Sequence, residues 1–218
     1  MKQDVASRAN TERFNAIAST FDDNPTRVEL AHGVASAILE AVPIDGTTRA
    51  MELGCGTGLV TALLAPRLRH VLAVDGSAKM LEALGRKASE LGILNIEPME
   101  SDLAQELPPG PFDLIYSSMT LHHIDDVAAL FRRAYQRLAP AGRVAFADLA
   151  LEDGTFHAAG VPGVMHHGFE AATLRGWLEA AGFVDVQGRI AHVVRKTRAD
   201  GSMREYPVLL VTAQASST

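Results

Sequence analysis

Three closely spaced glycines follow a short apolar run and open a segment with helical spacing. They are Gly54, Gly56 and Gly58 in the segment 52–58 (ELGCGTG). A strand that ends in glycines and turns directly into a helix brings the backbone close to a ligand, and the helix N-terminus offers unpaired N–H groups. We assign a turn conformation to Gly54, room for the ligand to Gly56, and close helix–strand packing to Gly58. The pattern predicts a strand–loop–helix unit that holds a carboxylate or a phosphate.

Strand and helix patterns alternate on both sides of this loop. Such alternation predicts a parallel sheet with helices on both faces and right-handed crossovers. The segment 103–111 is short and rich in proline, so no full-length crossover helix is expected there. The expected strands are 50–53, 70–75, 95–99, 112–117 and 143–149, and the expected helices are 59–68, 77–91 and 125–138, the last ended by Pro140 and Gly142.

The end of the chain has a different pattern. A helix is expected at 170–181, followed by strands at 183–194 and 205–213. The basic residues 195–198 and the turn signal Asp200-Gly201 separate these two strands. We therefore expect an antiparallel pair with a solvated, basic tip.

Two helical patterns precede the first strand within residues 11–42, and Asn24-Pro25 is a favourable start for the second. We expect an N-terminal helical cap over residues 1–45 and a single globular unit over residues 46–218. The predicted fold class is α/β, with a Rossmann-like, doubly wound, mostly parallel seven-stranded sheet that ends in an antiparallel hairpin.

The spacing of the glycines separates two families of nucleotide-binding loops. Nicotinamide and flavin enzymes usually show G-x-G-x-x-G, whereas this loop reads E-x-G-x-G-x-G with Glu52 on the strand. Asp75 ends an apolar run about twenty residues later, where a carboxylate holds ribose hydroxyls. Together with the antiparallel end, these residues resemble the class I S-adenosylmethionine-dependent methyltransferases, and in particular the small-molecule group that includes the ubiquinone and menaquinone biosynthesis enzymes. The resemblance is strongest over residues 51–149.

The resemblance implies S-adenosylmethionine as the cofactor. Its methionine part would lie on the glycine loop, with Glu52 near its amino group. Asp75 would accept the ribose hydroxyls and Asp102 the adenine amino group, with helix or turn capping as the alternative role for both. Cys55 is interpreted as filling the tight turn, with a nucleophilic role as the alternative. The expected cofactor-binding residues are Glu52, Gly54, Cys55, Gly56, Asp75, Gly76, Ser101, Asp102, Leu103 and Ser117.

The segment 116–124 (YSSMTLHHI) follows the fourth strand, where the acceptor meets the cofactor sulfur in relatives. One of its paired histidines is a candidate base, because imidazole titrates near neutrality. The alternative is that one histidine packs against or caps the next helix while the other forms a pocket wall. A second histidine pair lies in the glycine-rich loop after the fifth strand. The candidate catalytic residues are His122 and His123, and the candidate acceptor-side residues are Tyr116, Met119, His122, His166 and His167.

Composition excludes several function classes. The formal net charge of −6 argues against a nucleic-acid partner. The histidine spacing matches no recognised metal site, and a single cysteine cannot form an internal disulfide. We find no apolar run of about 18 residues and no hydrophobic signal core, so no membrane association and a cytoplasmic location are expected.

The function expected is methyl transfer from S-adenosylmethionine to a small, uncharged or weakly polar acceptor by a monomer or homodimer. The alternatives are a catalytically silent S-adenosylmethionine-binding protein and a nicotinamide-dependent oxidoreductase. The acceptor, the type of atom methylated and the need for a base stay open.

Overall fold

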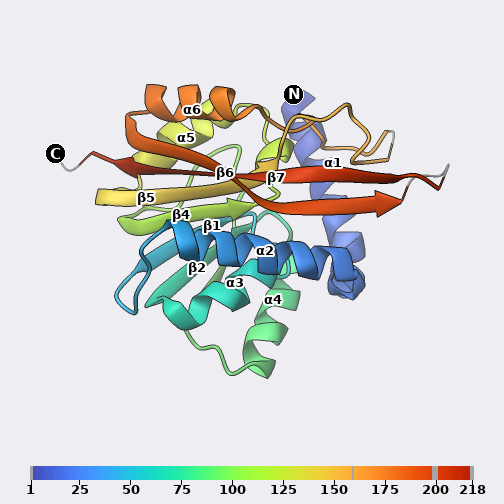
Figure 1. Ribbon diagram of the computed structural model, residues 1–218. Coiled ribbons are helices and arrows are strands. Elements are labelled where there is room, and N and C mark those ends of the chain that lie inside the picture. The colour runs from blue at the N-terminus through green and yellow to red at the C-terminus, as the bar shows by residue number, and fades with distance from the viewer. Residues whose placement is uncertain (1, 159, 198–200, 217–218) are drawn as a thin grey trace.

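A seven-stranded sheet with helices on both faces forms the centre of the computed structural model, which describes residues 2–158, 160–197 and 201–216 (Figure 1). The strand order is β3-β2-β1-β4-β5-β7-β6. All pairs from β3 to β5 are parallel, whereas β7 is antiparallel to both of its neighbours. The strands are β1 (Arg49–Leu53), β2 (His70–Asp75), β3 (Ile96–Glu100), β4 (Phe112–Ser118), β5 (Leu138–Leu149), β6 (Phe183–Thr197) and β7 (Met203–Ala215). The predicted fold class is confirmed.

Helices cover the two faces of the sheet unequally. One apolar cluster joins α2, α3 and α4 to one face, and a second joins α5 and α6 to the other. The helices are α1 (Lys2–Ile17), α2 (Pro25–Ala41), α3 (Leu59–Leu64), α4 (Ala78–Glu90), α5 (Val127–Tyr135) and α6 (Ala171–Ala180), with 3-10 helices η1 (Ala18–Asp23), η2 (Ala65–Arg67) and η3 (Leu121–His123). Helices on both faces of a mainly parallel sheet explain why its central strands are almost entirely buried.

Capping side chains begin the helices at the predicted residues. The Asn24 side chain accepts from the backbone N–H of Thr26 (3.0 Å) and starts α2. Ser77 Oγ accepts from the N–H of Met80 (3.2 Å) and starts α4. Both bonds satisfy an N–H group that the first turn of a helix leaves unpaired. No described helix is long and apolar enough to cross a membrane.

The boundary between α5 and β5 differs from the prediction of a helix over 125–138. The helix ends at Tyr135, and β5 already begins at Leu138, so Pro140 and Gly142 lie within the strand instead of ending a helix. The register between β4 and β5 shifts in this stretch, and such an irregularity accommodates a proline that has no N–H to donate. The predicted Asp200-Gly201 turn falls partly on residues 198–200, outside the described residues.

The strand order reverses beside β1, which has β2 on one side and β4 on the other. Ligands of doubly wound folds bind beyond the carboxyl ends of the strands at such a reversal. Helix α1 lies on that side of the molecule, at the right in Figure 1, and so do the end of β6 and the start of β7.

Candidate cofactor and acceptor site

A cavity of about 1400 Å³ opens at the carboxyl ends of the parallel strands. The glycine loop and the ends of β2, β3 and β4 form one part of its wall. Helix α1, the start of α2, the loop after β5 and the end of β6 form the other part.

Each glycine of the loop has a left-handed backbone, with φ of +68° at Gly54, +55° at Gly56 and +77° at Gly58. A β-carbon at Gly56 would meet nothing within 4 Å, because this residue faces the open cavity. A β-carbon at Gly54 would collide with the Thr120 side chain. At Gly58 the obstacle is Leu84 of α4, so this glycine allows packing between two helices and not the predicted helix–strand packing.

Asp75, at the end of β2, ties the glycine loop to the next helix. Its Oδ2 accepts from the N–H of Gly56 and its Oδ1 from the N–H of Ser77, both at 2.8 Å. Burial raises the pKa of this carboxyl, while the hydrogen bonds from Ser77 and Gly56 act in the opposite direction. Asp75 also lines the cavity, so the loop contacts leave it facing the space where a ligand would lie.

Glu52 lies deeper in the same wall and is almost fully buried. Its Oε2 accepts a hydrogen bond from the Thr61 hydroxyl. Burial raises the pKa of this carboxyl to about 7, with the Thr61 bond acting against the shift. A cationic group brought into the cavity beside Glu52 would favour its charged form.

All of the predicted cofactor residues except Ser117 line the cavity. Asp102 closes a turn, where its carboxylate accepts from the N–H of Ala104 (2.9 Å) and from Gln105 Nε2 (3.2 Å). Ser117 is fully buried in β4, away from the cavity, and its Oγ has no partner in the described structure. Burial raises the pKa of the Cys55 thiol, so it is no thiolate nucleophile at neutral pH. The predicted residues that line the cavity are Glu52, Gly54, Cys55, Gly56, Asp75, Gly76, Ser101, Asp102 and Leu103.

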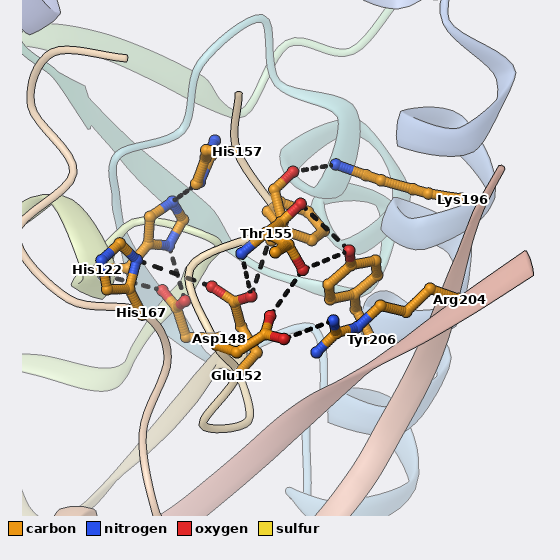
Figure 2. Close-up of polar contacts among 11 residues, drawn as sticks. His122, Asp148, Glu152, Thr155, His157, His167, Lys196, Arg204 and Tyr206 are labelled. Carbon is orange, nitrogen blue, oxygen red and sulfur yellow. Dashed lines mark hydrogen bonds and ion pairs between the residues drawn. The ribbon is translucent and has the colours of Figure 1, made fainter. Parts of the chain in front are cut away.

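His122 is held by a carboxylate from the neighbouring strand (Figure 2). Its Nδ1 lies 2.7 Å from Oδ1 of Asp148 at the end of β5, and both side chains are almost fully buried. Its Nε2 lies 3.2 Å from Nε2 of His157, which comes from the loop after β5. Burial would raise the pKa of Asp148, but the interactions with His122 and the Leu149 N–H outweigh it and lower that pKa. An ionised Asp148 fixes the proton of His122 on Nδ1 and leaves Nε2 as the basic atom.

His123 has a different environment. Its Nδ1 lies 2.6 Å from the carbonyl oxygen of Gly163, and its ring meets Phe14 of α1 edge-on at 5.5 Å between centroids. Burial lowers the pKa of His123 to about 3, and the neighbouring His122 acts in the same direction. The imidazole is therefore neutral, with a proton on Nδ1 for the Gly163 carbonyl.

The other predicted acceptor residues are only partly brought together. Met119 lines the cavity with an unusual φ of +56°. Tyr116 is fully buried beside Glu52 and is not part of the cavity wall. His166 Nε2 lies 2.9 Å from the carbonyl oxygen of Ile124, and His167 Nδ1 lies 3.7 Å from Oε1 of Glu152. Neither histidine lines the cavity.

Several cavity residues were not among those predicted from the sequence. The sequence shows His157 only as a histidine upstream of the pair 166–167, and it lines the cavity. Asp148, at the predicted strand end, contacts His122 but does not line the cavity. The prediction of a solvated basic tip is wrong for Lys196, which is half-buried and lines the cavity. Arg13 and Arg27 also line it, although their helices showed only an apolar pattern in the sequence.

Comparison with known proteins gives consistent matches. A family model described as a methyltransferase domain matches residues 26–187. An uncharacterised methyltransferase of Mycobacterium tuberculosis (strain ATCC 25618 / H37Rv) is 34% identical over 125 residues, which cover 56% of this chain and 62% of the relative. A trans-aconitate 2-methyltransferase of Azoarcus sp. (strain BH72) is 33% identical over 127 residues, or 57% of this chain and 46% of the relative. The matched region is thus less than two thirds of either relative.

Among solved structures, the DhpI–SAH complex has a similar fold. Its TM-score is 0.75 at 21% identity, over 97% of this chain and 98% of that one. The chain therefore belongs to the methyltransferase domain family, which confirms its resemblance to the class I S-adenosylmethionine-dependent methyltransferases.

Proposed function

We propose that this protein binds S-adenosylmethionine in the cavity and transfers its methyl group to a small molecule. The observation that carries the proposal is the position of Gly56, where the backbone faces an open cavity that a β-carbon would enter. The Asp75 carboxylate fixes that backbone and faces the same space. Family membership supports the proposal, since this loop is the part of the chain with the most specific sequence pattern.

The wall residues match the chemical groups of the cofactor in order. Gly54, Cys55 and Gly56 would support the methionine part, and Glu52 its amino group. Asp75 would accept the ribose hydroxyls, and the segment 101–103 would line the adenine pocket. When bound, the cofactor supplies a methyl group on a sulfonium, which already has a good leaving group. The protein then needs only to align the acceptor, exclude water and remove a proton where the acceptor has one.

We assign proton removal to His122 and positioning to Asp148. The acceptor atom would give its proton to Nε2 of His122 as it takes the methyl group that the bound cofactor would supply. In the structure His157 occupies the direction that the acceptor would take, 3.2 Å from His122 Nε2. His123 is neutral and is engaged by Gly163 and Phe14, so we assign it to the wall of the acceptor site.

We also propose that residues 1–45 form a cap, with α1 as its closing part. Asn15 of α1 accepts from the Ser77 hydroxyl at 2.7 Å, next to Asp75. Asp22 accepts from the Thr57 hydroxyl at 2.6 Å and pairs with Lys87 at 2.7 Å. Helix α2, in contrast, packs its buried apolar residues on the sheet and would stay in place. A cytoplasmic enzyme that acts as a monomer or homodimer completes the proposal.

Two binding titrations and one activity measurement test this function. Calorimetric titration should show binding of S-adenosylhomocysteine and none of NAD. Radiolabelled S-adenosylmethionine, incubated with the protein and a protein-free extract of small molecules, should yield a labelled small product. Binding without transfer to any fraction would favour a catalytically silent protein. NAD binding without a response to S-adenosylhomocysteine would favour an oxidoreductase.

A further inference from the structure

Three cations from three distant segments line the same part of the cavity. They are Arg13 of α1, Arg27 of α2 and Lys196 of β6, and all are half-buried. Each cation lies over an aromatic ring, at 4.5 Å for Arg13 on Phe14, 4.1 Å for Arg27 on Phe21 and 3.5 Å for Lys196 on Phe156. Ring faces attract and orient a cation without cancelling its charge.

None of the three cations forms an ion pair with a carboxylate within the described part of the chain. Arg27 donates to the Phe21 carbonyl (3.0 Å), and Lys196 donates to the Phe156 carbonyl (2.7 Å; Figure 2). Arg13 donates to the Asn10 side chain (3.1 Å), while its Nε is buried and has no hydrogen-bond partner in those residues. A buried N–H donor without a partner carries a free-energy cost that a ligand oxygen would remove.

The charges also act on one another. Burial lowers the pKa of Arg13 and of Lys196, and the positive charge of Arg27 lowers both further. Asp22 and Glu152 act in the opposite direction on the pKa values of Arg27 and Lys196, but neither carboxylate forms an ion pair with them in the described residues. Three cations in one cavity attract an anion, although the whole chain carries a net charge of −6.

The cations lie on the acceptor side of the cavity. Burial lowers the pKa of His157 to about 4, and among the charges that lower it further are Lys196 and Arg13. His157 in turn contacts His122, the proposed base. Two of the three cations, Lys196 and Arg13, therefore act on the histidine that contacts the proposed base.

We infer that the methyl acceptor carries an oxyanion, a carboxylate, phosphate or phosphonate group, that is held by Arg13, Arg27 and Lys196. The inference rests on the proposed function and specifies the chemical class of its substrate. It replaces the uncharged acceptor expected from the sequence. An anchor at this position would orient a nearby acceptor atom toward His122, and the same positive charge would favour the deprotonated form of that atom.

Small aromatic oxyanions test the inference, because the cations lie among aromatic rings. Phenylphosphonate and benzoate are titrated into the protein with and without saturating S-adenosylhomocysteine, beside the neutral benzyl alcohol and benzamide. The two anions should bind and the two neutral compounds should not. Raising the salt concentration should weaken anion binding, since part of the attraction is screened.

Two charge-removing variants identify the binding residues. Arg13→Gln and Lys196→Gln should each weaken phenylphosphonate binding about tenfold or more, the scale of one charge-assisted hydrogen bond. Their affinity for S-adenosylhomocysteine should stay within about twofold of the wild type. Arg175→Gln is the matched control, because Arg175 is exposed on α6, pairs with Glu179 and does not line the cavity in the described structure. It should change neither affinity.

Three results would overturn the inference. The first is equal binding of the neutral and anionic probes, and the second is anion binding that survives in both variants. The third is loss of S-adenosylhomocysteine affinity in both variants with no loss of anion affinity, which would assign the cations to the cofactor carboxylate. Failure of the proposed function would look different. In that case the wild type would not bind S-adenosylhomocysteine, while the anion titrations without it would still report on the three cations.

Discussion

The two sides of the cavity are built in different ways. On the cofactor side, short loops at successive strand ends hold one another, as when Asp75 accepts from Gly56 and Ser77. On the acceptor side, Arg13 and Lys196 come from segments more than 180 residues apart, and the positive charge of Arg27 acts against both. The family match over 26–187 covers the whole cofactor side but includes neither of these two cations. The cofactor side is therefore preformed by its own hydrogen bonds, whereas the acceptor side needs a bound anion to balance its positive charge.

The largest effect is expected from filling the open space beside Gly56 in the glycine loop. Gly56→Val should abolish measurable binding of S-adenosylhomocysteine, because the added side chain enters the open cavity where the cofactor would lie. Gly92→Val is the matched control, since Gly92 shares a left-handed φ (+67°) and open space but lies outside the cavity. Calorimetry measures binding, and circular dichroism checks the fold. Wild-type affinity for S-adenosylhomocysteine in the Gly56 variant would show that the glycine loop does not bind the cofactor.

The second prediction separates the two histidines. His122→Asn should lower turnover roughly 10²–10⁴-fold. It should also remove the acidic limb of the pH–rate profile, because an imidazole base must be neutral to accept a proton. His123→Asn should raise the KM of the acceptor and leave the shape of that profile unchanged. Both variants should keep their affinity for S-adenosylhomocysteine. The measurement is turnover against pH with the acceptor found by radiolabelling.

The same experiment tests the positioning role of Asp148. Asp148→Asn should lower turnover while the rate still depends on His122, so the double variant should be little worse than His122→Asn alone. Turnover that falls in His123→Asn as far as in His122→Asn would contradict the division between base and wall.

A third prediction concerns Glu52 and pH. Its pKa in the folded protein is raised to about 7, above the ordinary value of 4.5. The folded state therefore favours the protonated form, so this contribution to stability is fully present below pH 4.5 and is lost as the pH rises to 7. Relative to Glu52→Gln, the wild type should lose roughly 2–3 kcal/mol over this window. Urea unfolding at pH 4.5 and pH 8 measures the difference.

Binding of the cofactor should favour the ionised form of Glu52 and so lower its pKa. A bound ammonium group beside Glu52 favours the carboxylate, so wild-type binding of S-adenosylhomocysteine near pH 6.5 should release a proton. Calorimetry in buffers of different ionisation enthalpy detects this proton, and Glu52→Gln should release none from this site. Equal proton release by both proteins would remove Glu52 from the site of the amino group.

The smallest effect is expected where α1 touches the cofactor side. Asn15→Ala removes the acceptor for the Ser77 hydroxyl and for the N–H of Lys79. Because Ser77 keeps its own cap on α4, the cost should be about 1 kcal/mol in S-adenosylhomocysteine affinity. Hydrogen exchange over residues 11–23 should slow on binding in the wild type and slow less in the variant. Unchanged exchange in the wild type would indicate that α1 is a fixed wall and not a closing cap.

The cofactor side could be predicted from the sequence because its determinants are local. A left-handed turn requires glycine, and a strand end followed by an acidic residue specifies both position and chemistry within a few residues. The prediction that Ser117 binds the cofactor is not supported, because Ser117 pairs with Leu53 and Phe146 inside the sheet and does not line the cavity. One residue along a strand is enough to change which side of the sheet a side chain faces.

On the acceptor side only Met119 and the two histidines of the segment 116–124 could be predicted, because the other determinants are distant in sequence. The His122–Asp148 contact joins residues 26 positions apart, and the ends of β4 and β5 bring them together. Lys196 belongs to a basic run that favours a solvent-exposed tip when the sequence is considered alone. Only the packing of β6 against its neighbours places this lysine in the cavity. The early end of α5 has a similar cause, since pairing with β4 prevails over the local helical pattern.

The position of β7 has a consequence for how such an enzyme can change. Because β7 runs antiparallel between β5 and β6, β6 returns to the same direction as the parallel strands, and its carboxyl end reaches the cavity edge. The hydrogen bonds by which Asp75 holds the glycine loop and the next helix involve neither β6 nor β7. Under the proposed function, a change of charge at the end of β6 would therefore alter acceptor preference and leave those bonds in place.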